Sequence, residues 1–199
     1  GPLTFVDQYD EEFSRDIEPM KGGHGDAYYY QLIANIRRYK GARPIPPVVP
    51  KPIDIDGVFE DWRAVSPEFR DTLGDPVHRD HRCWAKDSQY LNQTGRNDLA
   101  TTKISFDTAN IYFYIQTKDP ITAPSDPNWM LLFIDIDHNP KTGWLGYDVI
   151  INRSNVRPQV TTLEHNVAGK YEWNQPADIP YRIANNQLEL AIPRTTLGI

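Results

Sequence analysis

The chain has 199 residues, of which 39% are hydrophobic and 24% are charged, and its formal net charge is −6. This composition is typical of a globular protein with one good-sized domain and room for an appended segment. Proteins that bind nucleic acid carry basic surfaces, so the acidic balance argues against that class. No apolar run approaches the roughly 20 residues that a membrane helix needs, so we expect no membrane span.

Residues 1–41 form the first predicted unit, which contains one amphipathic helix. Asp26 can cap a helix that starts at Ala27, and Gly41 marks its end. The side chains that recur at helical spacing are Tyr29, Leu32, Ile33, Ile36 and Lys40. An amphipathic helix needs a surface against which its apolar face can pack. We therefore expect the apolar face of this helix to pack against another surface of the protein.

Prolines are dense in residues 42–52, the second predicted unit. Such a composition keeps the chain extended and semi-rigid. We predict that this stretch is a linker, and that residues 53–199 form a separate domain after it.

Short strand patterns follow the linker. The segments Ile104–Asp107 and Ile111–Thr117 predict a β-hairpin. In the second segment alternate residues from Ile111 to Ile115 are apolar, which is typical of a half-buried strand. The apolar run Met130–Asp135 predicts a central strand. The polar stretch Arg70–Thr102 has no clear period, and we expect a long loop there.

Four more strands are expected at Tyr147–Asn152, Gln159–Leu163, Tyr181–Ile183 and Leu188–Ile192. Many short strands separated by Pro, Gly and Asn predict a mainly β fold. The expected architecture is an antiparallel β-sandwich, jelly-roll or immunoglobulin-like, with one N-terminal amphipathic helix.

One segment points to a family. Ile53–Trp62 has the sequence IDIDGVFEDW, which resembles the opening I-D-G-x-x-D/E-x-x-W of family 9 carbohydrate-binding modules. Later segments resemble further strands of that family in the same order: Ile111–Ile115, Leu132–Asp135 and Leu188–Pro193, with Leu197 and Gly198 after them. The resemblance covers about residues 53–199.

This resemblance implies a β-sandwich that often binds sugar, often holds structural calcium and assists a catalytic glycoside hydrolase. Family members usually continue with further strands after the match to Gly198, so those strands are lacking here or come from elsewhere. Phe13–Pro19 and the helix up to Gly41 look like the last loop and helix of a glycosidase-like domain. The protein is then expected to be secreted, periplasmic or attached to the cell surface.

The acidic stretch after Leu132–Asp135 predicts a metal site. Asp135, Asp137 and Asn139 alternate, and Asp148 can close the set from the next strand. Hard cations such as calcium prefer clustered oxygen ligands of this kind. The alternative is that these side chains only make hydrogen bonds within a turn.

Aromatic side chains in loops are candidate sugar contacts, because an exposed ring can stack on the apolar face of a pyranose. The candidates are Trp84, Trp129, Trp144 and Trp173, together with Tyr90 and Tyr147. The alternative is a rim of aromatics packed on the sandwich. Trp62, in the segment that resembles the family, is expected in the core.

Arg96, Asn97 and Asp98 are candidate hydrogen-bonding partners of sugar hydroxyls. The alternative is an ordered turn in which Arg96 pairs with an acid. His78, His81 and Cys83 do not complete a standard zinc site. No catalytic motif is present, and we predict no enzymatic activity.

The predicted function is that of a non-catalytic module that binds an oligo- or polysaccharide beside a catalytic domain of the same polypeptide. The alternative is a structural spacer or interaction domain that braces a glycosidase-like neighbour. An apolar patch around Leu32 and Ile36 would favour the alternative. A glycoside hydrolase in its own right, or a haem-binding relative that uses Met130, is less favoured.

Overall fold

The structure is a computed structural model. It describes residues 34–39, 41, 47, 49–74, 79–82, 88–126, 128–154 and 156–199. The chain divides into two compact units, residues 1–45 and 46–199, and the division falls within the stretch predicted as a linker. Among the described helices, none has the length and apolarity to cross a membrane.

The first unit contains a helical stretch at residues 34–39, within the range predicted to be helical. All six side chains are exposed, including Ile36 at 46%. Leu32, which we expected to share an apolar patch with Ile36, and the predicted cap Asp26 lie outside the described residues.

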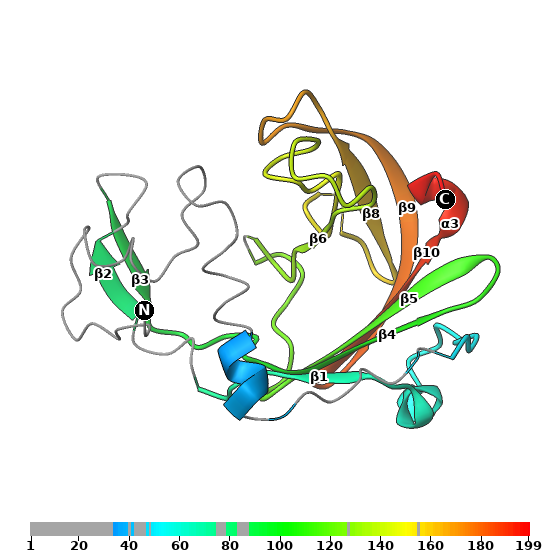
Figure 1. Ribbon diagram of the computed structural model, residues 1–199, viewed down its shortest axis with the longest axis horizontal. Helices are drawn as coiled ribbons and strands as arrows, with labels where there is room; N and C mark the ends of the chain where they lie inside the picture. Colours follow the sequence, from blue (N-terminus) through cyan, green and yellow to red (C-terminus); the bar gives the residue numbers. More distant parts are fainter. Residues whose placement is uncertain are drawn as a thin grey trace. The chain divides into compact units, whose positions relative to one another are not determined.

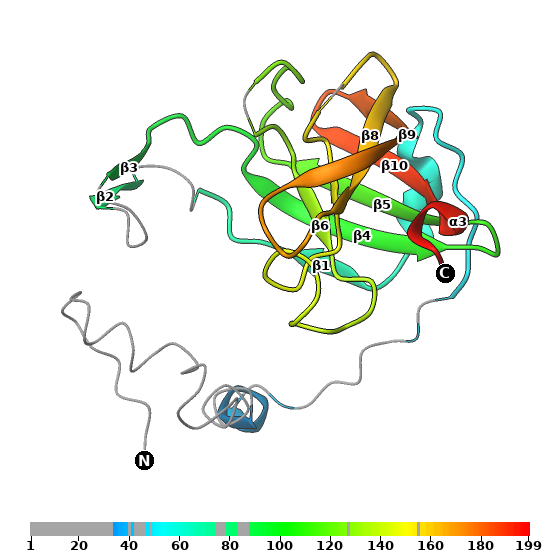
Figure 2. The same ribbon diagram turned by 90° about the horizontal axis from the view of Figure 1, so that it is seen from above.

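The second unit is mainly β. Eight antiparallel strands form one sheet in the order β1-β4-β5-β10-β9-β8-β7-β6. The strands are β1 (Glu68–Arg70), β4 (Leu99–Phe106), β5 (Asn110–Thr117), β6 (Leu132–Ile134), β7 (Val149–Ile151), β8 (Val160–Asn166), β9 (Trp173–Ala184) and β10 (Gln187–Pro193). The sheet curls so that β6 and β8 lie over β4 and β5 (Figures 1 and 2). The predicted antiparallel, sandwich-like fold is confirmed.

The hairpin predicted around Thr108–Asn110 is present. Strands β4 and β5 pair from Phe106 and Ile111 onwards. The Asp107 carboxylate closes the turn by accepting the Asn110 N–H at 2.7 Å and the Tyr112 hydroxyl at 2.6 Å. The bond from Tyr112 lowers the pKa of Asp107, because it favours the ionised form.

The curled sheet buries apolar side chains on both faces. The inner core contains Trp129, Val149, Ile151, Leu163, Ile179, Tyr181, Leu188, Leu190, Ile192 and Leu197. The predicted alternation in β5 is confirmed, because Phe113 and Ile115 pack on this core while Tyr112 and Tyr114 face the opposite side. There Trp62, only 2% exposed, packs on Tyr114 at a centroid distance of 5.3 Å.

Trp62 belongs to the 3-10 helix η1 (Phe59–Ala64), which covers the outer face of the sheet. Its indole N–H donates to the carboxylate of Glu189 at 2.9 Å, and the Gly57 N–H donates to the same carboxylate at 2.7 Å. Glu189 is fully buried, and this burial raises its pKa. The core position expected for Trp62 is confirmed, and its acidic partner is a new finding.

Two expectations need correction. The run at Met130–Asp135 supplies β6, which is a three-residue strand at the edge of the sheet and not a central strand. The polar stretch Arg70–Thr102 is not one continuous loop. It contains β2 (Arg79–Arg82) and β3 (Gln89–Asn92), which pair as a separate two-stranded sheet, and the first residues of β4. The residues of β2 and β3 are mostly polar, so hydrophobic periodicity gives no signal for this hairpin.

The chain after β10 forms a single helical turn, α3 (Arg194–Leu197). Gly198 caps it in the left-handed conformation at φ 75° and donates its N–H back to the turn. Leu197 is 6% exposed and joins the inner core.

Candidate functional site

A tight turn in the connection between β6 and β7 presents two aromatic side chains. Trp144 and Tyr147 exchange backbone hydrogen bonds of 2.9 and 3.0 Å. Leu145 and Gly146 between them have φ values of 54° and 97°, as the central residues of a type I′ turn require. Leu145 is 69% exposed, so the tip of the turn lies in solvent.

Gly143 makes this turn possible. It has φ +62°, and a Cβ atom at this position would lie 2.1 Å from the backbone oxygen of Tyr147. No side chain fits so close to a carbonyl oxygen, and the left-handed conformation is itself unfavourable for other residues. The position of Trp144 therefore depends on glycine before it.

A second turn, between β8 and β9, carries Tyr171. The Asn166 side chain holds this turn, since its Oδ1 accepts the Gly169 N–H at 3.0 Å and its Nδ2 donates to the Lys170 carbonyl at 2.7 Å. These local bonds fix the backbone that leads to Tyr171 without help from the core.

The two turns, with Phe133 of β6 and Trp173 of β9, bring five aromatic rings together. The ring centroids of Trp144 and Tyr171 are 4.8 Å apart, and those of Tyr171 and Trp173 are 5.9 Å apart. Phe133 of β6 lies 5.6 Å from Trp144 and 5.4 Å from Tyr147. Separations of this size are those of favourable aromatic pairs. We call these five residues the aromatic cluster.

The aromatic cluster is partly open to solvent. Tyr171 is 48% exposed, Tyr147 is 40% exposed and Trp144 is half-buried. Trp173 lies beneath them at 9%, and its indole Nε1 has no hydrogen-bond partner in the described part of the chain. Exposed rings that rest on other rings offer a ligand an apolar surface that is already formed.

A hollow of about 440 Å³ opens between the same two turns. Its lining comprises Lys141, Thr142, Gly143, Asp148, His165, Asn166, Ala168 and Gly169. Gly143 directly precedes Trp144, and Gly169 lies two residues before Tyr171, so the hollow and the aromatic cluster share their supporting turns. The lining offers hydrogen-bond donors and acceptors next to exposed rings.

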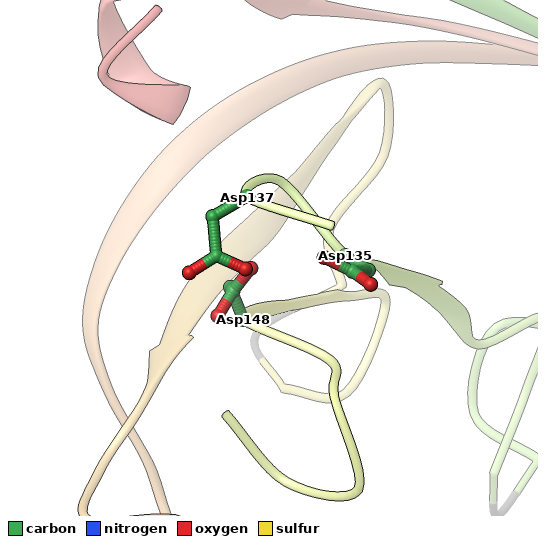
Figure 3. Close-up of side chains that lie close together, drawn as sticks. All are labelled: Asp135, Asp137 and Asp148. Carbon is green, nitrogen blue, oxygen red and sulfur yellow. The ribbon is translucent and has the colours of Figure 1, made fainter. Parts of the chain in front are cut away.

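Three carboxylates gather at this end of the sandwich. Asp135 and Asp137 follow β6, Asp148 precedes β7, and one oxygen of each lies within 4.8 Å of the others. The carboxylates of Asp137 and Asp148 approach each other closely (Figure 3). Such a group is a candidate cation site, because calcium takes clustered carboxylate oxygens as ligands.

The same side chains also make the hydrogen bonds of an ordered turn. Asp148 Oδ2 accepts the Ile136 N–H at 2.8 Å, and Asp137 Oδ1 accepts the Asn139 N–H at 2.9 Å. Asn139, the fourth predicted ligand, accepts the Lys141 N–H at 3.1 Å. The turn interpretation therefore accounts for bonds that are present, and each of these side chains keeps further oxygen lone pairs for a cation.

A second cavity of about 520 Å³, which we call the apolar groove, lies on the inner face of the sheet. Its apolar lining is Leu99, Ile104, Phe113, Ile115, Met130, Leu131 and Leu132, and its remaining lining is Arg96, Asn97, Thr102, Lys103, Tyr114 and Asn128. Ile104 is 39% exposed, so part of this face is open to solvent.

The polar residues predicted to contact sugar lie at or near the apolar groove. Arg96 pairs with Asp126 at 3.1 Å, and Asn97 Nδ2 donates to the Thr122 hydroxyl at 3.0 Å. Asp98 is only 2% exposed. These contacts match the alternative interpretation, an ordered turn in which Arg96 is paired with an acid.

The predicted aromatic contacts are distributed over several places. Trp144 and Trp173 belong to the aromatic cluster. Trp129 is 1% exposed, and its indole N–H donates to the Thr122 carbonyl at 2.8 Å, so its ring presents no face to a ligand in this structure. Tyr90 lies on β3, and its side chain is not described.

Three residues of the sequence prediction fall outside the described ranges: Trp84, and His78 and Cys83 of the incomplete zinc group.

Sequence reasoning missed three contributors to this site. Tyr171 stands two residues before Trp173, and this spacing is the one signal that could have placed the two side chains together. Phe133 looked like an ordinary strand residue. Asn166 carries no signal at all, because its bonds depend on a turn whose shape is not visible in the sequence.

Comparisons with known proteins gave no identification. No protein-family model matches the sequence, no curated protein matches it significantly, and no solved structure matches the fold significantly. The resemblance to family 9 carbohydrate-binding modules therefore stays a prediction that rests on the residues quoted above.

Proposed function

We propose that residues 53–199 form a non-catalytic carbohydrate-binding module of a larger extracytoplasmic protein that processes polysaccharides. The observation that carries this proposal is the aromatic cluster, in which the exposed Tyr171 and the half-buried Trp144 stand on the turns that line a polar hollow. The resemblance supplies the setting, in which a neighbouring catalytic domain acts on the glycan that the module holds.

The chemistry of sugars matches this surface. A pyranose has apolar C–H faces and a rim of hydroxyl groups, so it needs an aromatic ring and hydrogen-bonding groups close together. Tyr171 and Trp144 offer the rings, while Lys141, Asp148 and His165 in the adjacent hollow offer donors and acceptors. Few of these side chains need to reorganise, since the turns that carry them are fixed by their own hydrogen bonds.

The test is calorimetric binding to soluble oligosaccharides chosen from a glycan array, with the Trp144→Ala variant compared against the unaltered chain. We expect the variant to bind at least tenfold more weakly, a loss of about 1.4 kcal/mol. Phe69→Ala is the matched control, because Phe69 is 50% exposed but lies on β1 outside the aromatic cluster. It should bind as the unaltered chain does.

Two results would refute this proposal. One is an array and calorimetry with no glycan signal at all. The other is a Trp144→Ala variant that binds as tightly as the unaltered chain. Release of new reducing ends from the bound glycan would instead show that the chain is a hydrolase.

The apolar groove favours the second candidate function, a structural spacer or interaction domain that braces a neighbouring domain. Open apolar surface of this kind is typical of a protein–protein contact. This second function would be supported if the unaltered chain binds no glycan but binds the apolar dye ANS, and if the Ile104→Ser variant no longer binds ANS. Ile104 is chosen because it lines the groove and is 39% exposed.

A further inference from the structure

The rings of the aromatic cluster do not share a plane. The planes of Trp144 and Tyr171 meet at 70°, and those of Tyr171 and Trp173 meet at 88°. Phe133 is tilted by 37° to Trp144 and by 47° to Tyr147. Of these pairs, Trp144 and Tyr171 both reach the solvent, and their steep angle means that these two rings do not form a flat surface.

A flat surface is what a crystalline polysaccharide requires. Its face presents many sugar rings in one plane, and a protein that lies on it must offer several parallel aromatic rings at one level. In this cluster, a sugar ring parallel to Trp144 is steeply inclined to Tyr171. At most one ring of this pair can therefore stack on a planar sugar lattice at a time.

The hollow gives the ligand a place to enter. At about 440 Å³ it lies toward the small end of the range found for small-molecule sites. Its walls come from the two turns that carry Trp144 and Tyr171, although no ring of the aromatic cluster lines it. A rigid crystal face cannot enter a hollow of this size, whereas a few units of a separate chain can.

We infer that the site takes a short stretch of a single, soluble glycan chain, and not the face of a crystalline polysaccharide. This inference rests on the proposed function and narrows its ligand class. The ligand has at least one sugar ring stacked on Trp144 or Tyr171 and a neighbouring unit hydrogen-bonded within the hollow.

The experiment measures the chain against soluble and crystalline forms of the same glycans. Mono- to hexasaccharides of cellulose, xylan and chitin are titrated by calorimetry, and crystalline cellulose and chitin are tested by co-sedimentation. We expect binding to at least one soluble series, with an affinity that stops rising after about three sugar units because the hollow holds no more. Binding to the crystalline solids should be at background.

Lys141 and Lys170 provide a matched pair of variants for the hollow. Lys141 lines it, whereas Lys170 lies in the second turn and is not part of the lining. We expect Lys141→Ala to weaken binding of the soluble oligosaccharide several-fold, and Lys170→Ala to leave it unchanged. Both variants keep their backbone hydrogen bonds, so neither should alter the melting temperature.

The outcomes separate the inference from the proposed function. Co-sedimentation with a crystalline solid without affinity for soluble oligosaccharides overturns the inference and leaves carbohydrate binding standing. An affinity that keeps rising up to the hexasaccharide indicates an extended surface and also overturns the inference. If Lys141→Ala and Lys170→Ala lose affinity for the oligosaccharide equally, the ligand lies outside the hollow, and the inference is overturned. Absence of any binding overturns the proposed function, and the inference with it.

Discussion

Glu189 illustrates how a single residue can link folding to pH. Its carboxylate is fully buried and accepts hydrogen bonds from Trp62 and Gly57. Burial penalises the ionised form more than these bonds favour it, so its pKa lies above the ordinary value of 4.5. The native state therefore holds this proton more tightly than the unfolded chain does.

From this shift we predict that the free energy of unfolding falls as pH rises from about 4.5 through the folded-state pKa of Glu189. The unfolded state binds fewer protons in this window, so the slope is negative, at most about 1.4 kcal/mol per pH unit. Glu189→Gln should remove this component. Urea denaturation of both proteins between pH 4 and pH 8 measures it, and a difference between them that is the same at every pH would contradict the assignment.

The acidic triad leads to a prediction about calcium. We expect millimolar calcium to raise the melting temperature. A free calcium concentration 100 times the Kd of the site adds about 2.7 kcal/mol to the free energy of unfolding. Asp148→Asn should abolish this increase, since Asp148 is one of the three carboxylates that come within 4.8 Å. Glu60→Gln, which alters an exposed acid of η1, is the control. If calcium does not change the melting temperature of the unaltered chain, the three carboxylates serve only the hydrogen bonds of the turn.

At the scale of elements, two short turns do most to build the candidate site. The turn at Trp144–Tyr147 depends on a glycine that no other residue can replace, and the turn before Tyr171 depends on the amide of Asn166. Both turns lie at the same end of β6 to β9. Because these strands are neighbours in the sheet, the loops that connect them also lie next to each other. Pairing of β7 with β8 thus determines which aromatic side chains meet.

We predict that Gly143→Ala destabilises the chain by more than the roughly 1–2 kcal/mol of a left-handed backbone alone. The added Cβ would also meet the Tyr147 carbonyl oxygen at 2.1 Å, so the turn must open and sugar binding should be lost. Gly198→Ala is the control, because Gly198 has φ +75° and no atom within 4 Å of the added Cβ. Equal destabilisation by the two substitutions, measured by thermal denaturation, would show that the close approach does not matter.

At the scale of the whole molecule, the first residues of the sandwich, Lys51 to Ile53, are bound to its own sheet. The Lys51 N–H donates to the Phe106 carbonyl at 2.9 Å, and the Ser105 hydroxyl donates to the Lys51 carbonyl at 2.7 Å. Ile53 is buried against the outer face of the sheet. Among the described residues, neither core cluster of the sandwich includes a residue before Ile53, which follows the proline-rich stretch.

We predict that a fragment of residues 46–199 folds alone, with a melting temperature within about 2 °C of that of the full chain. It should also keep the full affinity for whichever oligosaccharide the chain binds, since the aromatic cluster and the hollow lie within this unit. A fragment that unfolds at much lower temperature, or that loses binding, would show that the first unit contributes to the sandwich.

Several features could be predicted from the sequence because they depend on local pattern. Alternation in β5 determined that Phe113 and Tyr114 face opposite sides, and the turn at Thr108–Asn110 determined the hairpin. The sequence also predicted a ligand group of Asp135, Asp137, Asn139 and Asp148, and the structure brings its three carboxylates together. In each case the residues are close along the chain, so a strand and a turn are enough to set their geometry.

Other features were decided only by tertiary structure. Trp62 and Glu189 are 127 residues apart and meet because η1 folds over β10. Trp144 and Tyr171 meet because β7 pairs with β8, and β6 lies at the edge because no described strand pairs with its other side. Side-chain period shows which face of a strand is buried, but it carries no information about which strand lies next to it. That choice comes from long-range packing of the curled sheet.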